Sequence, residues 1–247
     1  MPLDATTLWV GVSLLIAAFV KGTTGLGFPM IATPTVALLL DIRTAVTILL
    51  IPNIVMDITQ ALRGSFPTAV LRRFAWLILL TIIGVFLGTR LLVILPLWVL
   101  NLSLGIMVLT FVASNLLRLN FQIPPRLEGA LSPVVGVIGG FLNGMTNASG
   151  PALAIYLYSL KLPKKEFIKS IATIFIVTKM SQLVAVSTWD LFTFSRLLLS
   201  LEVTVFILAG FYAGLKTQDR INQKTFNHGL LIFLFVVGVT LIIRSLV

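Results

Sequence analysis

Two short polar stretches lie inside hydrophobic segments, and their residue types suit the binding of a small anion. The first reads KGTTGLGFP, from Lys21 to Pro29, and the second reads NGMTNASGP, from Asn143 to Pro151. Hydroxyl and amide side chains donate hydrogen bonds to oxyanion oxygens, and glycine lets backbone N–H groups approach a ligand closely. Because proline fits the first turn of a helix, each stretch predicts a helix that begins beside the anion.

The start of a helix carries free N–H groups and roughly half a positive charge, which favours an anion. Lys21 adds a full positive charge, while Asn147 and Ser149 are candidate N-caps of the second helix. Each stretch taken alone also suits close helix packing, which stays open as an alternative. The predicted substrate-binding residues are Lys21, Gly22, Thr23, Thr24, Gly25, Gly27, Asn143, Gly144, Thr146, Asn147, Ser149 and Gly150.

Two further pairs of polar residues lie within apolar segments. Asp57 and Gln60 stand 122 positions before Lys179 and Gln182. Ionisable groups inside a membrane are candidates for functional roles, so we expect these four residues to line a cavity or to couple transport to an ion. Asp57 is the candidate for a coupling proton.

These polar residues belong to a chain that is far too apolar for a water-soluble fold. Of its 247 residues 58% are hydrophobic and 11% charged, and the mean hydropathy is +1.08. The apolar runs are roughly 20 residues long and do not alternate, which predicts an all-α integral membrane protein and not a barrel.

The remaining composition excludes several classes of function. The net charge of +10 comes from Lys and Arg in short loops, which indicates topology determinants and no nucleic-acid partner. There is no cysteine, no nucleophile and base pair, no metal-ligand cluster and no phosphate-binding loop. We therefore predict no catalytic residues, no metal, no cofactor and no enzymatic activity.

The chain contains an internal repeat. A shift of 122 residues places Gly22, Thr24, Pro29, Ala32 and Leu38 on Gly144, Thr146, Pro151, Ala154 and Leu160. Farther on, a shift of 126 matches Gly84 and Gly88 to Gly210 and Gly214. The sequence thus predicts a first transmembrane repeat at 1–118, a linker at 119–129 and a second repeat at 130–247. The predicted segments are a broken hairpin at 8–40 with spans at 44–62, 70–93 and 97–118, then a broken hairpin at 130–160 with spans at 166–186, 195–215 and 226–246.

Length and charge predict how the hairpins lie. A hairpin of roughly 33 residues is too short for two crossings, so we expect two half-depth arms, and a helix from Pro29 to Leu40 would be about 18 Å long. If each hairpin returns to the face it entered, one face collects 12 basic residues and the other 4. This bias favours returning hairpins, an inverted second half and both termini outside. Inverted repeats with broken helices are typical of secondary transporters.

At these residues the chain resembles the sulfite exporter TauE/SafE family of membrane permeases. The likeness lies in KGTTGLGFPMIATP and NGMTNASGPALAIY, and the pattern of spans extends over essentially the whole chain. In the second stretch, Asn147, Ala148 and Ser149 stand where the family often has glycine. By resemblance, the motif residues are Gly22, Gly25, Gly27, Pro29 and Pro34, with Gly144, Gly150 and Pro151.

The resemblance implies a carrier of small sulfur-containing anions, including sulfite and organosulfonates, in the bacterial inner membrane. We therefore predict a secondary transporter, an exporter by resemblance, that works by alternating access around two facing breaks. Its expected partners are a small anionic substrate, the lipid bilayer and a coupling proton, while the oligomeric state is not indicated. A passive anion channel and a non-transporting scaffold or enzyme subunit are the alternatives.

Overall fold

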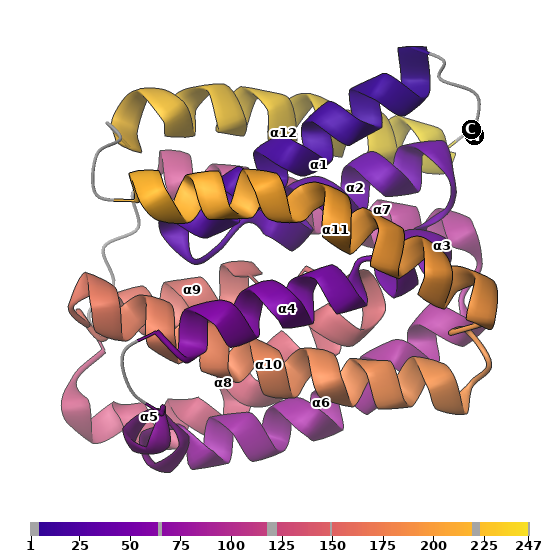
Figure 1. Ribbon diagram of the computed structural model, residues 1–247. Coiled ribbons are helices and arrows are strands. Elements are labelled where there is room, and N and C mark those ends of the chain that lie inside the picture. The colour runs from indigo at the N-terminus through magenta and orange to yellow at the C-terminus, as the bar shows by residue number, and fades with distance from the viewer. Residues whose placement is uncertain (1–4, 64–65, 118–122, 149, 219–222, 247) are drawn as a thin grey trace.

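The computed structural model describes residues 5–63, 66–117, 123–148, 150–218 and 223–246, which form twelve helices and no strand (Figure 1). The helices are α1 (Ala5–Thr24), α2 (Phe28–Leu39), α3 (Ile42–Ile48), α4 (Leu50–Ala61), α5 (Thr68–Arg73), α6 (Ala75–Ile94), α7 (Leu97–Leu116), α8 (Pro125–Thr146), α9 (Gly150–Ser159), α10 (Lys164–Thr188), α11 (Phe194–Thr217) and α12 (Gln223–Leu246).

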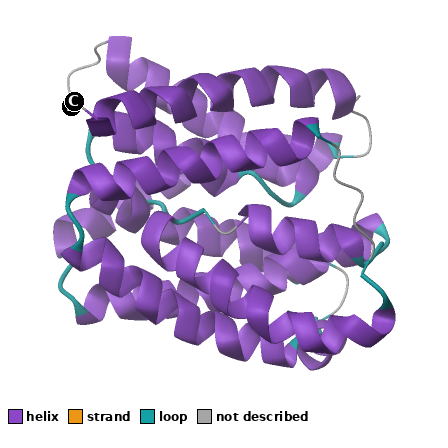
Figure 2. Cartoon of the chain, turned by 180° about the vertical axis from the view of Figure 1, so that it is seen from behind, coloured by secondary structure: helices purple, strands orange, loops and turns teal. Residues whose placement is uncertain are grey.

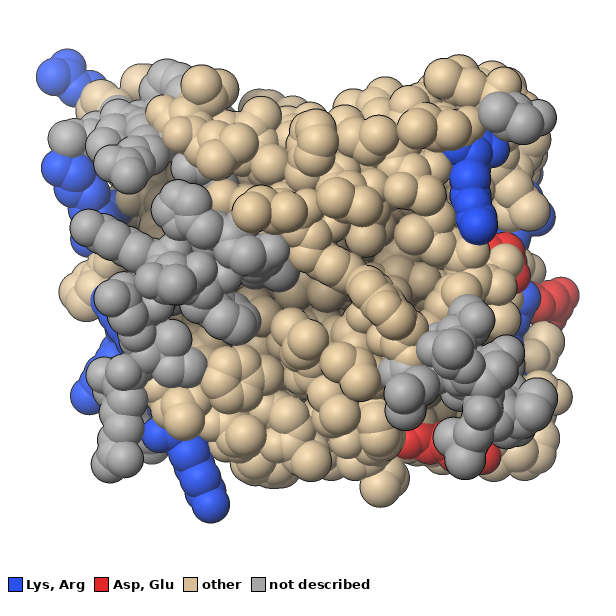
Figure 3. All heavy atoms as spheres, turned by 90° about the horizontal axis from the view of Figure 1, so that it is seen from above, with Lys and Arg blue, Asp and Glu red and all other residues tan. Residues whose placement is uncertain are grey.

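The helices have the lengths and surfaces of a membrane protein. Within the described residues, six helical segments are long and apolar enough to cross a bilayer. On α6, Leu79, Ile83 and Leu87 are each about half exposed, and their spacing of four places them on one helix face. Charged side chains gather at the two ends of the molecule, with a broad uncharged band between them (Figure 3). The chain is an all-α integral membrane protein, as predicted.

Two connections lie inside the bundle, whereas most others lie at its ends (Figure 2). They separate α1 from α2 and α8 from α9. The inner arms α2 and α9 have 12 and 10 residues, or about 18 and 15 Å. The length predicted for the first inner arm is therefore confirmed.

The outer arms are longer than predicted. Helix α1 has 20 residues and α8 has 22, about 30 and 33 Å, so neither is a half-depth arm. Helix α1 continues through Lys21 to Thr24, and only the three residues 25–27 interrupt the hairpin. Helix α8 begins in a polar turn with Arg126 and Glu128, ahead of its apolar part. The expectation failed because Thr and Gly do not end a helix that neighbouring helices support.

The two hairpins enter from opposite ends. In Figure 1, α1 begins and α12 ends at the right-hand end of the bundle. The α1–α2 hairpin returns to that end, and the α8–α9 hairpin returns to the left-hand end. This is the arrangement that an inverted repeat requires; the repeat itself stays a prediction.

Glycines bring two pairs of helices into backbone contact. A Cβ added at Gly88 of α6 would lie 2.0 Å from the carbonyl oxygen of Phe141 in α8, and one at Gly214 of α11 would lie 2.3 Å from that of Phe19 in α1. Small residues allow this approach, which is a common source of stability between helices in lipid. Each hairpin thus packs on a helix from the other half of the chain.

We expect Gly88→Ala to lower the thermal unfolding temperature of the purified protein. Backbone atoms of α8 cannot yield easily to the added methyl group, and overpacking of this kind costs about 1–3 kcal/mol. Gly129→Ala is the matched control because nothing lies within 4 Å of its added Cβ. Unfolding followed in detergent should show a lowered transition for Gly88→Ala only. Equal transitions would contradict the close α6–α8 contact.

Candidate functional site

The first break begins at the carbonyl group of Lys21. The N–H of Gly25 donates to the Lys21 oxygen over 2.9 Å, and Nε2 of Gln60 in α4 donates to the same oxygen over 2.8 Å. Gly25 and Gly27 have φ of 81° and 97°, which glycine adopts without strain. The chain therefore leaves α1 and enters α2 within three residues.

The second break has the same arrangement, 122 residues later. The carbonyl oxygen of Asn143 accepts from the N–H of Asn147 over 2.7 Å and from Nε2 of Gln182 over 3.0 Å. Asn147 takes the left-handed position with φ of 64°. The residue is thus the C-cap of α8, and its predicted role as N-cap of α9 is wrong. Ser149 lies outside the described residues.

An ion pair lies beside the first break. The ammonium of Lys21 donates to Oδ1 of Asp57 in α4, and both side chains are 0% exposed. The same Nζ lies 4.8 Å from the centre of the Phe175 ring, a cation–π contact with α10. Lys21 belongs to the last turn of α1 and not to the non-helical backbone.

In the second half the positions are exchanged: Lys179 stands where the first half has Asp57, and Asn143 stands where it has Lys21. Lys179 donates to Oδ1 of Asn143 over 2.5 Å, to Oδ1 of Asn147, and to the Asn147 carbonyl oxygen over 3.4 Å. Three oxygen acceptors match the three protons of an ammonium group. Lys179 is 1% exposed, and no carboxylate of the described residues lies within ion-pair distance of it.

A side-chain contact joins the two breaks. Nδ2 of Asn147 donates to the hydroxyl oxygen of Thr33 over 3.0 Å, and Thr33 lies one turn beyond Pro29 in α2. Nδ2 of Asn143 donates to Oε1 of Gln182 over 2.7 Å. As predicted, Pro29 and Pro151 both stand in the first turn of an inner arm.

The predicted threonines shape the breaks with their hydroxyl groups. Thr23 and Thr24 each donate to the Val20 carbonyl oxygen over 2.9 Å, and Thr146 donates to that of Leu142 over 2.8 Å. Because a hydroxyl group has one proton, these three hydroxyl groups donate to backbone carbonyl oxygens in this conformation.

Gly22 and Gly144 lie at packing contacts. A Cβ added at Gly22 would lie 2.4 Å from the carbonyl oxygen of Phe211, and a Cβ added at Gly144 would lie 2.3 Å from that of Val85. Close packing accounts for glycine at both positions, so we assign them to packing. Gly150 begins α9.

Two residues at the breaks, Thr33 and Phe175, have no clear signal in the sequence. Thr33 and Phe175 are 0% and 1% exposed and touch the polar groups directly. Thr33 follows Pro29 by four residues and so lies on the same helix face; this spacing is the signal that could have predicted its place at the break. Phe175 is one of many phenylalanines in apolar segments and had no such hint.

The buried cluster of Lys21, Asp57 and Lys179 holds one more basic than acidic side chain. It brings two amines and one carboxyl group into a region that is closed to solvent. Among the described residues, Oδ2 of Asp57 and Oε1 of Gln60 have no hydrogen-bond partner; both atoms are acceptors, which need a donor and not an anion. The group of this cluster that suits a small anion is the Lys179 amine, because no carboxylate of the described residues pairs with it.

Comparison with known proteins identifies the family of the chain. The model of the family described as sulfite exporter TauE/SafE matches residues 10–241, nearly the whole chain. Comparisons with curated proteins and with solved structures gave no match. From the extent of the family match, we conclude that the chain belongs to the sulfite exporter TauE/SafE family.

Proposed function

We propose that the protein is a secondary transporter that exports a small anion, such as sulfite, a sulfonate or another organosulfur anion, by alternating access around the two helix breaks. Membership of the family makes the chain a membrane transport protein and not an enzyme, and implies a small anionic substrate. The proposals on substrate, export and alternating access rest on the buried cluster.

The observation that supports the proposal most is the environment of Lys179. Its ammonium is buried, and the oxygens around it in the described residues are neutral amide and carbonyl oxygens. In the first half the buried ammonium, Lys21, is paired with the Asp57 carboxylate. A substrate anion provides the missing counter-charge when one of its oxygens replaces the Asn147 amide oxygen at Lys179. When the anion leaves, the amide oxygen returns.

The position of the cluster supports alternating access. It lies where hairpins from opposite ends of the molecule meet, and inverted-repeat transporters hold their substrates at such places. Lys21 and Lys179 are sealed from solvent, so the path is closed around the site. A continuously open anion channel would leave them wet, and the sealed core therefore favours a carrier.

Charge distribution supports the orientation. The end that holds Arg63, Lys161, Lys164, Lys165 and Lys169 is the more basic, and the positive-inside bias assigns it to the cytoplasm. Both termini then face outward, in a cell inner membrane.

Asp57 is the proposed site of proton coupling. A proton on Asp57 would release Lys21 from its ion pair and add a positive charge to the cluster. Proton binding and anion binding then favour each other, and by linkage the two effects are equal.

Flux in proteoliposomes tests the proposal. We expect saturable, protein-dependent efflux of sulfite or ethanesulfonate that exceeds efflux of sulfate and acetate and responds to a pH gradient. Unlabelled substrate on the opposite side should accelerate exchange of labelled substrate, which a channel does not do. Absence of protein-dependent flux for all four anions, with and without the gradient, would refute the transport assignment.

A further inference from the structure

An open space lies between the buried cluster and the basic end of the molecule. It is a cavity of about 620 Å³ formed by the end of α4, the first turns of α10 and the C-cap of α11. A volume of this order is typical of small-molecule sites and leaves room for water around a small anion. The lining residues are Gln60, Arg63, Lys164, Lys165, Glu166, Ile168, Lys169 and Gln218.

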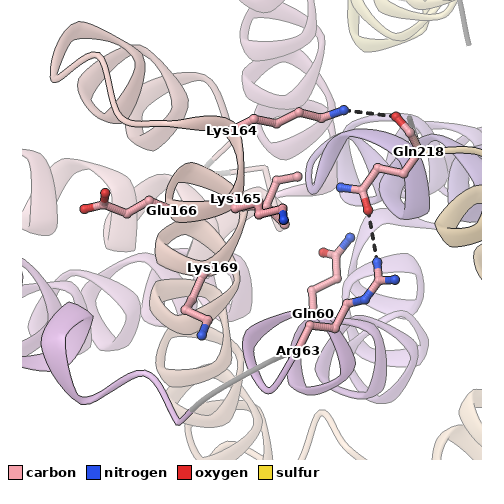
Figure 4. Close-up of a pocket in the computed structure, with 8 residues that line it drawn as sticks. Gln60, Arg63, Lys164, Lys165, Glu166, Lys169 and Gln218 are labelled. Atoms are coloured by element: carbon pink, nitrogen blue, oxygen red, sulfur yellow. Dashed lines mark hydrogen bonds between the residues drawn. The ribbon is translucent and has the colours of Figure 1, made fainter. Parts of the chain in front are cut away.

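Basic side chains outnumber acidic ones in the described lining of the cavity. It brings Arg63 together with three lysines within six residues of α10 (Figure 4). The carboxylate of Glu166 points away from the space between these cations and bonds to Nη1 of Arg73 over 3.1 Å. Arg73 is also bonded to Glu128 over 2.7 Å, and this hydrogen bond raises the pKa of its guanidinium group. The acidic residue in the lining is therefore directed elsewhere.

Gln218 holds two of the cations at the rim. Its Oε1 accepts from Nη1 of Arg63 over 3.0 Å, and its carbonyl oxygen accepts from Nζ of Lys164 over 3.0 Å. These contacts connect α11 to α4 and to α10 across the cavity (Figure 4). The basic side chains are thus arranged around one space.

The floor of the cavity touches the first helix break. Gln60 is 2% exposed and donates to the Lys21 carbonyl oxygen over 2.8 Å. Ile168 lies beside the break as well, because a Cβ added at Gly25 would stand 3.1 Å from its Cγ1. Two residues of the cavity lining, Gln60 and Ile168, therefore also contact the first break.

We propose that this cavity is a second anion-binding site, which collects a hydrated sulfite or sulfonate group from the basic face before it passes Gln60 to the buried cluster. The proposal rests on the proposed function for the direction of passage, but the binding site stands on its own geometry. Cations that surround one cavity concentrate anions there, and salt weakens the effect. The headgroup of an anionic lipid has similar chemistry; the place of Gln60 in both the cavity lining and the first break favours the free anion.

Direct binding of labelled sulfite to the full chain in nanodiscs tests the site independently of transport. The test variant is Lys165→Gln/Lys169→Gln, and the control is Lys216→Gln, an exposed lysine of the same basic end that does not line the cavity. In zwitterionic lipid we expect the double variant to weaken binding about thirtyfold at low salt, which corresponds to roughly 1 kcal/mol for each of the two charges removed. The control should bind like the unchanged protein.

A variant without the Lys179 ammonium distinguishes binding in the cavity from binding in the buried cluster. In Lys179→Met protein, the cavity should still bind sulfite, and that binding should still depend on Lys165 and Lys169. Persistence of binding without flux would leave the cavity site standing even if the transport assignment fails. If the cavity substitutions reduce flux only when the sulfite concentration is low, this result would support loading of the substrate from the basic end through the cavity.

Three outcomes would overturn the cavity site. The first is equal sulfite binding by the double variant and the control. The second is a difference that appears only when phosphatidylglycerol is present, which would identify a lipid headgroup as the occupant. The third is complete loss of sulfite binding in Lys179→Met protein, which would place all binding in the buried cluster.

Discussion

Replacement of Lys179 by methionine is expected to abolish anion flux in a protein that still folds. Methionine has a similar length and removes the buried ammonium that the substrate anion would neutralise. Truncation of one partner of a buried charge contact costs about 2–5 kcal/mol, which corresponds to a fall of about 30-fold to a few thousand-fold in flux at low substrate concentration. Sulfite efflux from proteoliposomes, scaled to the amount of inserted protein, measures the effect.

Stability should change little in the same variant. Removal of an uncompensated buried charge is favourable, while loss of donors to the Asn143 and Asn147 oxygens costs about 1–3 kcal/mol for a group left unsatisfied. Lys216→Met is the control, because this exposed lysine of α11 lies outside the cluster. Flux by Lys179→Met within threefold of the control would refute the role given to the ammonium group.

The second large effect concerns the pair of Lys21 and Asp57. Asp57→Asn leaves the Lys21 ammonium buried without its carboxylate, and removal of one partner of a buried pair costs about 3–5 kcal/mol. We expect poor insertion or a much lower unfolding temperature. Unfolding in detergent and the yield of monodisperse protein are the measurements.

A double variant distinguishes a structural loss from a functional one. Lys21→Met/Asp57→Leu removes both charges and should recover most of the stability, because apolar replacements of buried pairs are often neutral. Under the proposed coupling, it should remain without pH-dependent flux. Glu128→Gln breaks the partly exposed pair with Arg73 and should cost no more than about 1 kcal/mol. Similar losses for Asp57→Asn and Glu128→Gln would contradict the burial of the first pair.

Most of the fold was predictable because hydrophobic runs set helix positions in a membrane. The predicted spans at 97–118 and 166–186 correspond to α7 and α10. The outer arms could not be placed, because helix continuation through Gly22 depends on close contact with α11, which no local pattern reports. Helix α8 is longer than predicted because its first turn is polar, and a prediction from hydropathy does not include polar turns.

The polar core was partly predictable. The shift of 122 residues related Asp57 to Lys179 and Gln60 to Gln182, and the structure places all four side chains at the breaks. The sequence did not reveal that Lys21 pairs with Asp57, since this contact depends on how α1 crosses α4. The basic cavity was missed for the same reason: its lining comes from three distant segments.

The position of a bound substrate analogue tests the central claim most directly. Selenite has the shape and charge of sulfite, and its selenium atom can be located by anomalous scattering in crystals of the full chain. The account predicts a selenium site at the two breaks, with an oxyanion oxygen within hydrogen-bond distance of Nζ of Lys179. Selenite found only at sites remote from Lys179, in crystals of protein that transports sulfite, would contradict it.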